Sequence, residues 1–337
     1  MNIKFPDLLP TKIQALQDTV TAKANVNVFV QREDLIHPDL SGNKWYKLKW
    51  NIVQAQENHF STLLSFGGAY SNHIHALSAA GKIFGFSTIG LIRGDELVEK
   101  NLDEMNPTLI DATNNGMKLI YITRSQYRIK ESPEFLESLK KQFGSFYCIP
   151  EGGNNLLGIK GCAELLRPLP DTHQTPEKIF PDVICAASGT GCTIAGLVVG
   201  LHNLNYNKKP IQNEDPGKKP VDSEILGFNV LKGSHYIETN IKKYLSYLIA
   251  EPLASNIDNC WSMNHDYHCG GYGKVSGELL DFIDWFDSRH DIPLDPVYTG
   301  KLFYAVYDLI EKKHFPPGSN IMVIHSGGLQ GARGKSP

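Results

Sequence analysis

The sequence predicts an α/β protein whose strands form mostly parallel sheets, either a single sheet or two. Apolar, β-rich runs alternate with segments of helical period along most of the 337 residues. Residues 183–187 are apolar throughout, as expected for a strand buried on both faces of a parallel sheet. The chain also exceeds the usual size of a single hydrophobic core, so we expect two domains.

Each expected strand is a short apolar run, and each expected helix is a longer segment of helical period. We expect strands at residues 26–30, 62–66, 87–91, 118–122, 146–149, 183–187, 224–229 and 321–325. We expect helices at residues 44–57, 71–84, 102–116, 133–143, 155–167, 191–203, 236–250, 273–288 and 300–313. The stretch 203–223 is polar and contains prolines, which predicts an exposed loop rather than a domain boundary.

The composition is that of an ordinary globular protein, with 41% hydrophobic and 20% charged residues. A formal net charge of -3 argues against nucleic acid or an anionic membrane as the main partner. The first residues lack the apolar core of a signal peptide, and the longest apolar run, residues 194–201, is too short to span a bilayer. Six cysteines form no CxxC pair, which favours reduced thiols over a disulfide framework or a zinc site. We therefore expect a cytoplasmic protein without a metal.

The most informative feature is Lys44, which lies at a turn-to-helix junction in residues 41–48. Burial and nearby positive dipole ends disfavour the charged form of a lysine, and a neutral lysine amine can form an imine. The alternative interpretation is a surface lysine after a loop. Two further glycine-containing turns that precede helical segments favour the catalytic interpretation.

The loop at residues 188–193 follows an expected strand and opens an expected helix, so its backbone amides can hold a phosphate. The hydroxyls of Ser188, Thr190 and Thr193 can assist. A dinucleotide fingerprint fails because Ile194 stands where its third glycine belongs, and a Walker A loop fails because a cysteine stands in place of its lysine. The remaining alternatives are a phosphate site for another cofactor and a glycine-rich connection without a ligand.

The turn at residues 67–72 precedes another expected helix. The Ser71 hydroxyl and the first helical amides can hold a carboxylate, and the Asn72 side chain can reach a ring oxygen. The alternative for Ser71 is ordinary N-capping. His73 and His75 are two residues apart and face differently on a helix, so we interpret them as helix residues rather than metal ligands.

Near the C-terminus, residues 294–301 form another turn before a helix, and residues 325–328 follow an apolar strand. Strand ends that face a crevice are where α/β sheets bind ligands. Tyr298 can lie against an aromatic ring, while Thr299 and Ser326 can offer neutral hydroxyls to a ring nitrogen. Turn formation and helix capping are the alternative roles for all three.

Together these segments resemble the pyridoxal-phosphate enzymes of the 1-aminocyclopropane-1-carboxylate (ACC) deaminase and D-cysteine desulfhydrase family. The matching segments occur in family order and cover nearly the whole chain. They are Arg32-Glu33-Asp34, Ser41-Gly42-Asn43-Lys44, Gly67-Gly68, Ser71-Asn72, Pro150-Glu151-Gly152-Gly153, Ser188-Gly189-Thr190-Gly191, Asp295-Pro296-Val297-Tyr298-Thr299-Gly300-Lys301 and His325-Ser326-Gly327-Gly328.

The resemblance implies the two-domain fold of the tryptophan synthase β subunit, which is fold type II of the pyridoxal-phosphate enzymes. A small α/β domain of residues 52–160 would be inserted into a large cofactor-binding domain of residues 1–51 and 161–337. The active site would lie in the cleft between them. Family members are homo-oligomers, commonly dimers, so we also expect a homodimer.

The resemblance further implies the roles of individual residues. Lys44 would hold the cofactor covalently as an imine and act as the catalytic base, and Lys47 would help balance the phosphate charge. Ser71, Asn72 and His73 would bind the substrate. The implied cofactor-binding residues are Lys44, Asn72, Ser188, Gly189, Thr190, Gly191, Cys192, Thr193, Tyr298, Thr299 and Ser326, and the implied catalytic residues are Lys44, Ser71 and Tyr298.

Two positions near the cofactor ring separate the members of this family. ACC deaminases carry a glutamate and a leucine where this chain has Thr299 and Ser326, the hydroxyl pair typical of desulfhydrases. A carboxylate keeps the ring nitrogen protonated and makes the ring a strong electron sink, whereas a hydroxyl leaves the nitrogen closer to neutral. We therefore expect D-cysteine desulfhydrase activity, with ACC deaminase and a non-catalytic cofactor-binding protein as alternatives. Residues 271–275 also depart from better-known members.

Overall fold

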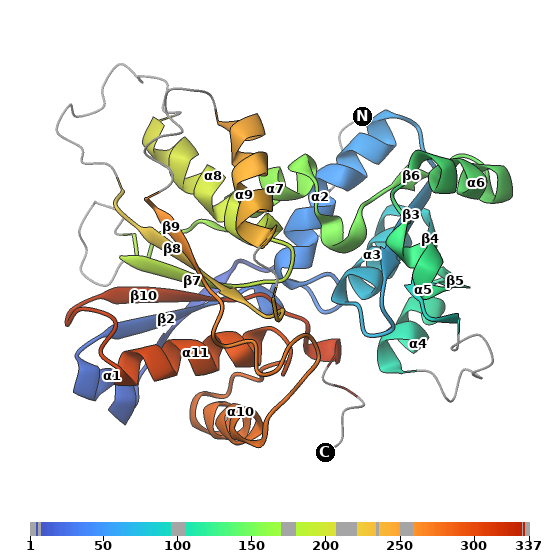
Figure 1. Ribbon diagram of the computed structural model, residues 1–337. Helices are drawn as coiled ribbons and strands as arrows, with labels where there is room; N and C mark the ends of the chain where they lie inside the picture. Colours follow the sequence, from blue (N-terminus) through green and yellow to red (C-terminus); the bar gives the residue numbers. More distant parts are fainter. Residues whose placement is uncertain are drawn as a thin grey trace.

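The computed structural model describes residues 5, 8–95, 106–169, 180–206, 221–233, 236–249, 259–331 and 333. Two sheets flanked by helices form the molecule, with the larger sheet to the left and the smaller to the right in Figure 1. Helix α2 (Gly42–Glu57) lies between them. The predicted α/β class with parallel-rich sheets is confirmed.

Within the described residues, the larger sheet holds six strands in the order β1-β2-β10-β7-β8-β9. Strand β1 pairs antiparallel with β2, and the other pairings are parallel. Ile321 of β10 lies opposite both Val28 of β2 and Val183 of β7, so the carboxyl ends of these three strands meet at one edge. The bounds are β1 Lys12–Leu16, β2 Asn27–Arg32, β7 Val183–Ser188, β8 Glu224–Asn229, β9 Trp261–Asn264 and β10 Asn320–His325.

The smaller sheet has the order β5-β4-β3-β6 in the described part of the chain, and its pairings are parallel. Its strands all fall inside the segment predicted as the inserted domain. The bounds are β3 Thr62–Gly67, β4 Ser87–Arg93, β5 Lys118–Ile122 and β6 Tyr147–Cys148. One cluster of buried apolar residues nevertheless runs across both sheets, from Leu63 of β3 to Met322 of β10. The division at residues 52 and 160 stays a prediction.

Helices cover both faces of the larger sheet, with α8 and α9 on one side and α1, α10 and α11 on the other (Figure 1). In the smaller lobe, α3 and α4 contribute to the cluster that reaches both sheets, while α5 and α6 pack into a separate cluster. The remaining bounds are α1 Thr19–Ala24, α3 Asn72–Phe84, α4 Pro107–Asn114, α5 Arg124–Arg128, α6 Pro133–Phe143, α7 Leu156–Cys162, α8 Cys192–Tyr206, α9 Tyr236–Leu248, α10 Gly277–His290 and α11 Thr299–Glu311. No helix within these described ranges is both long and apolar enough to cross a bilayer.

In the described residues the expected elements are found with bounds that mostly shift by a few residues. Residues 102–105 of the helix expected at 102–116, and residue 250 of the one expected at 236–250, lie outside the described residues. The helix at 133–143 matches α6 because Ser132 caps it and Pro133 opens it. The helix expected at 155–167 ends at Cys162 and continues as a 3₁₀ turn. Strands β1 and β9 and helices α1 and α5 were not predicted, because each is short and its stability depends on packing against neighbours. Of the loop expected at 203–223, residues 207–220 lie outside the described residues.

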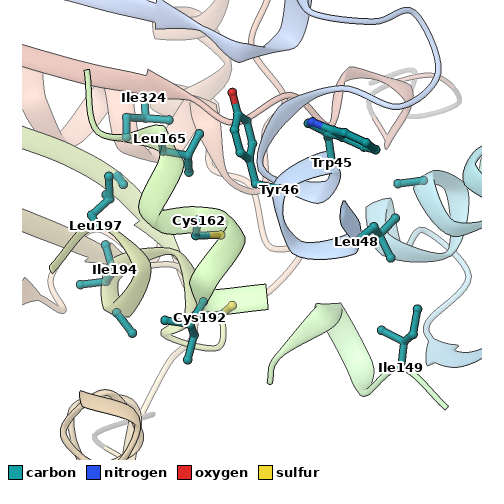
Figure 2. Packing of buried hydrophobic residues seen from close by; sticks show 14 of the residues in the cluster. Trp45, Tyr46, Leu48, Ile149, Cys162, Leu165, Cys192, Ile194, Leu197 and Ile324 are labelled. Atoms are coloured by element: carbon teal, nitrogen blue, oxygen red, sulfur yellow. The ribbon is translucent and has the colours of Figure 1, made fainter. Parts of the chain in front are cut away.

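Helices α2, α7 and α8 form the packed centre of the molecule (Figure 2). Trp45, Tyr46 and Leu48 of α2 are buried in the same cluster as Cys162 of α7 and the apolar residues of α8. This packing holds the first turn of α2 rigidly between the two sheets, and Lys44 lies in that turn.

Candidate active site

A cavity of about 550 Å³ opens between the first turns of α2, α3 and α8 and the ends of β7 and β10. Most of the predicted site residues line it, although they come from segments far apart in the sequence. Those lining residues are Lys44, Ser71, Asn72, His73, Ser188, Gly189, Thr190, Gly191, Thr193, Tyr298 and Ser326.

The first turn of α2 is fixed by contacts to two other parts of the cavity. Gly42 has φ +67°, and a Cβ there would lie 1.9 Å from the Ser326 carbonyl oxygen, so only glycine fits. The backbone amide of Asn43 donates to the Ser326 carbonyl at 3.2 Å, and its side-chain Nδ2 donates to Thr193 Oγ1 at 3.0 Å. These contacts present Lys44 to the cavity at a defined position.

Lys44 is partly buried, and removal of water from its amine by the surrounding protein is the main reason why its pKa falls from 10.5 to about 7. The neighbouring Lys47 ammonium lowers the pKa of Lys44 further. The lowered pKa gives Lys44 a much larger uncharged fraction near neutral pH than an ordinary lysine, which is almost fully charged there. A neutral amine is the form that attacks a carbonyl carbon.

The loop between β7 and α8 has the features of an anion site. Gly191 has φ +86° and leads into the first turn of α8, and Gly191 and Thr193 line the cavity. The first amides of a helix have no partner within it and can bind an anion. The Ser188 hydroxyl is buried and makes no hydrogen bond within the described residues. Lys47 lines the same cavity and is 4% exposed. A buried hydroxyl donor and a buried ammonium at a helix N-terminus fit a phosphate group.

Cys192 is the member of the predicted phosphate loop that does not line the cavity. Its Sγ lies 3.6 Å from the Gly153 carbonyl oxygen, and it is buried in the cluster that contains Cys162. Its side chain thus packs behind the loop, and its predicted contact with the cofactor stays a prediction.

The turn before α3 places Ser71 at the N-cap, where its Oγ accepts a 3.3 Å hydrogen bond from the Ile74 amide. Ser71 therefore caps the helix and also lines the cavity, and its role in holding a carboxylate stays a prediction. Asn72 follows it, and its Oδ1 accepts from Gln330 Nε2 at 2.9 Å. This contact holds the side chain of Asn72, which lines the cavity, against a residue close to the C-terminus.

The tautomer of His73 follows from its neighbours. Ser65 Oγ donates its hydrogen to the Ile149 carbonyl at 2.7 Å, so it must accept at 2.9 Å from His73 Nε2. His73 Nδ1 is then an acceptor, and it has no partner within the described residues. Burial, followed by the Lys44 and Lys47 charges, holds the pKa of His73 well below its ordinary value. His73 is thus a neutral acceptor at the cavity, within α3 as expected.

Tyr298 lines the cavity, and its ring meets the Tyr272 ring edge-on with centroids 6.1 Å apart. Thr299 is placed differently from the expectation. Its hydroxyl donates to Asp295 Oδ2 at 2.8 Å and accepts from the Asp295 amide at 2.8 Å, and the residue is fully buried outside the cavity lining. The threonine is bonded within its own turn because its neighbour Asp295 offers both a donor and an acceptor.

The lining residues that were not assigned a role from the sequence include three with an ionisable side chain at a segment end or turn. Arg93 comes from the end of β4, Glu151 from the Pro-Glu-Gly-Gly segment, and Tyr272 from the loop before α10. The position of Arg93 at a strand end was a usable signal, because such ends meet at a ligand crevice. Glu151 belongs to a segment that carries the resemblance, but its role was not inferred.

The sequence pattern of the family described as pyridoxal-phosphate dependent enzyme matches residues 6–327. The chain belongs to this family. Pyridoxal phosphate is therefore its cofactor, and the buried Ser188 hydroxyl, the ammonium of Lys47 and the low-pKa amine of Lys44 suit its phosphate and aldehyde groups. The predicted relation to fold type II enzymes is confirmed.

Known relatives cover nearly the whole chain. A Pyrococcus horikoshii protein provisionally named 1-aminocyclopropane-1-carboxylate deaminase is 29% identical, over 97% of this chain and 93% of its own length. The bifunctional D-cysteine desulfhydrase/1-aminocyclopropane-1-carboxylate deaminase of Arabidopsis thaliana is 28% identical, over 90% of this chain and 73% of its own. A solved ACC deaminase homologue superimposes with a TM-score of 0.75 at 27% identity, covering 96% of this chain and 91% of its own.

Proposed function

We propose that this enzyme is a deaminating lyase that acts on D-cysteine and releases hydrogen sulfide. The observation that carries the proposal is Lys44, a partly buried amine with a pKa lowered to about 7 that faces a cavity between two helix N-termini. One N-terminus suits the cofactor phosphate and the other a substrate carboxylate. The overall reaction converts cysteine and water into pyruvate, ammonium and hydrogen sulfide.

Bound pyridoxal phosphate supplies an electron sink for negative charge at the substrate's α-carbon. Ser71 and the first amides of α3 would hold the α-carboxylate, while the Lys44 amine would take the α-proton onto Nζ. Tyr298 would lie against the cofactor ring, and the neutral His73 Nδ1 can accept a hydrogen bond from an ammonium group. Ser71 and His73 would thus bind the substrate, Tyr298 would position the cofactor ring, and Lys44 would move the proton.

The absence of a carboxylate at positions 299 and 326 supports elimination over opening of a cyclopropane ring. Ser326 lines the cavity, and Glu151 is the single carboxylate among the described lining residues. A neutral ring nitrogen is adequate for a substrate with an α-proton and a good leaving group. ACC has no α-hydrogen, so its reaction depends more strongly on a protonated ring.

ACC deamination is the second candidate, and the names of two relatives favour it. A panel of D-cysteine, L-cysteine, D-serine and ACC separates the candidates when keto-acid release is measured with the purified holoenzyme. We expect the highest kcat/KM with D-cysteine. Efficient turnover of ACC together with none of D-cysteine would overturn the proposal. The expected homodimer is tested by light scattering at micromolar concentration.

A further inference from the structure

Arg93 gives the cavity a cationic group besides Lys44 and Lys47. It is exposed at the carboxyl end of β4 and lines the cavity together with Lys44 and Ser71. Its Nη2 lies 3.6 Å from the place that a Cβ would take at Gly68. The Ser71 amide donates to the Gly68 carbonyl at 3.0 Å, so Arg93 lies beside the turn assigned to the carboxylate.

The charges around Arg93 leave it without an ion-pair partner in the described part of the chain. Its Cζ lies 5.5 Å from the Tyr127 ring centroid, and Lys130 Nζ lies 4.7 Å from the same centroid. Lys130 pairs with Glu151 at 3.2 Å, which neutralises the one carboxylate of the described cavity lining. The Arg93 guanidinium is therefore available to an anion that enters the cavity.

The other anionic groups already have their own sites. The α8 N-terminus and Lys47 suit the phosphate, and the α3 N-terminus suits the α-carboxylate. We propose that Arg93 binds the β-substituent of the substrate, and that the enzyme favours amino acids whose β-substituent is negatively charged or departs as an anion. This inference rests on the proposed lyase function and specifies its substrate class.

The proposal also gives Arg93 a role when the leaving group departs. The bond from Cβ to the substituent breaks, the substituent leaves with the bonding pair as an anion, and the α-proton is on Lys44 Nζ. A guanidinium beside the departing group stabilises this charge through charge-assisted hydrogen bonds. The thiol of cysteine is neutral before cleavage and departs with the bonding pair as the hydrosulfide anion, which Arg93 would stabilise, whereas ACC has no such leaving group.

The test compares ligand pairs that differ in one charge, using the holoenzyme. Aspartate and asparagine of each configuration are titrated, and binding is followed through the change in visible absorption of the cofactor. We expect the wild type to bind the preferred aspartate enantiomer about 10- to 100-fold more tightly than the matching asparagine. Arg93→Met should abolish this preference, and Arg93→Lys should restore part of it.

Arg128→Met is the matched control, because Arg128 is exposed in the same lobe and does not line the cavity. It removes the same charge and should keep the preference for aspartate. A wild type without the preference, or a preference that survives in Arg93→Met, would overturn the role of Arg93. Keto-acid release from D-cysteine is measured in parallel. If that release is absent while the Arg93-dependent preference is present, the proposed lyase reaction fails and the anion site stands.

Discussion

The N-termini of α3 and α8 line the same cavity. They differ in whether the serine hydroxyl beside each one already has a hydrogen-bond partner within the protein. At α3 the Ser71 hydroxyl already accepts from the Ile74 amide, at a long 3.3 Å. At α8 the Ser188 hydroxyl is buried without a partner in the described residues, and buried Lys47 lines the same cavity. A group that is buried and unpaired costs stability until a ligand pairs with it. The α8 site is therefore suited to a resident cofactor, and the α3 site to a substrate that comes and goes.

The largest expected effect is that of Lys44→Ala, which removes the reactive amine and leaves both helix N-termini intact. Turnover should fall by several orders of magnitude, because the variant lacks the amine that we propose as nucleophile and base. The measurement is keto-acid release together with borohydride-reducible attachment of the cofactor. Lys82→Ala, at an exposed position of α3, is the control. A reducible attachment and near-full activity in Lys44→Ala would assign the chemistry to another lysine.

The contrast between the two termini predicts that Ser188→Ala and Lys47→Met act on the cofactor. Loss of a charge-assisted partner should raise the dissociation constant of pyridoxal phosphate roughly 10- to 100-fold. Equilibrium dialysis of the apoprotein measures this constant without any turnover. Unchanged cofactor affinity in both variants would contradict the assignment of the phosphate to α8.

Ser71→Ala should act on the other ligand. We expect the KM to rise about tenfold, because the carboxylate loses a hydroxyl donor, while the cofactor dissociation constant stays near its wild-type value. The same change removes an N-cap, so the free energy of unfolding should fall by about 1 kcal/mol. A larger effect on cofactor retention than on KM would reverse the assignments of the two termini.

At a third helix N-terminus, that of α11, the Thr299 hydroxyl already has its hydrogen-bond partners within the protein. It both donates to and accepts from Asp295, so Thr299→Val should lower the free energy of unfolding by about 1–3 kcal/mol. Thr299→Ser keeps the hydroxyl and is the control in chemical denaturation.

The double change Thr299→Glu with Ser326→Leu should raise the ratio of ACC turnover to D-cysteine turnover, although a second carboxylate beside Asp295 will lower the free energy of unfolding. An unchanged ratio would show that residues 299 and 326 do not determine which of the two reactions the enzyme favours.

The smallest expected effect concerns pH. Cofactor attachment to the apoprotein requires neutral Lys44, whose pKa is lowered to about 7 mainly by burial. The attachment rate should rise only about twofold between pH 7 and pH 9, whereas a lysine of ordinary pKa would give a rise of nearly a hundredfold. Stopped-flow absorbance measures the rate. A steep rise up to pH 9 would show that Lys44 has an ordinary pKa.

The amino-acid sequence by itself determined the alternation of strands and helices and the turns that hold Lys44, Ser71 and the 188–193 loop. These features are local, because hydrophobic period and turn residues act over a few positions. The α6 bounds were predictable for the same reason, since Ser132 and Pro133 mark its start. The resemblance of the combined segments then indicated the family, which the comparison confirmed.

Only the tertiary structure decided which side chains face the cavity. Arg93 and Glu151 reach it from separate segments, while Thr299 and Cys192 turn away to pair with neighbours that the sequence pattern could not weigh. The low pKa of Lys44 likewise requires burial by packing of α2 against other helices. Lining, pairing and burial depend on contacts between residues far apart in the chain, and local patterns contain no information about them.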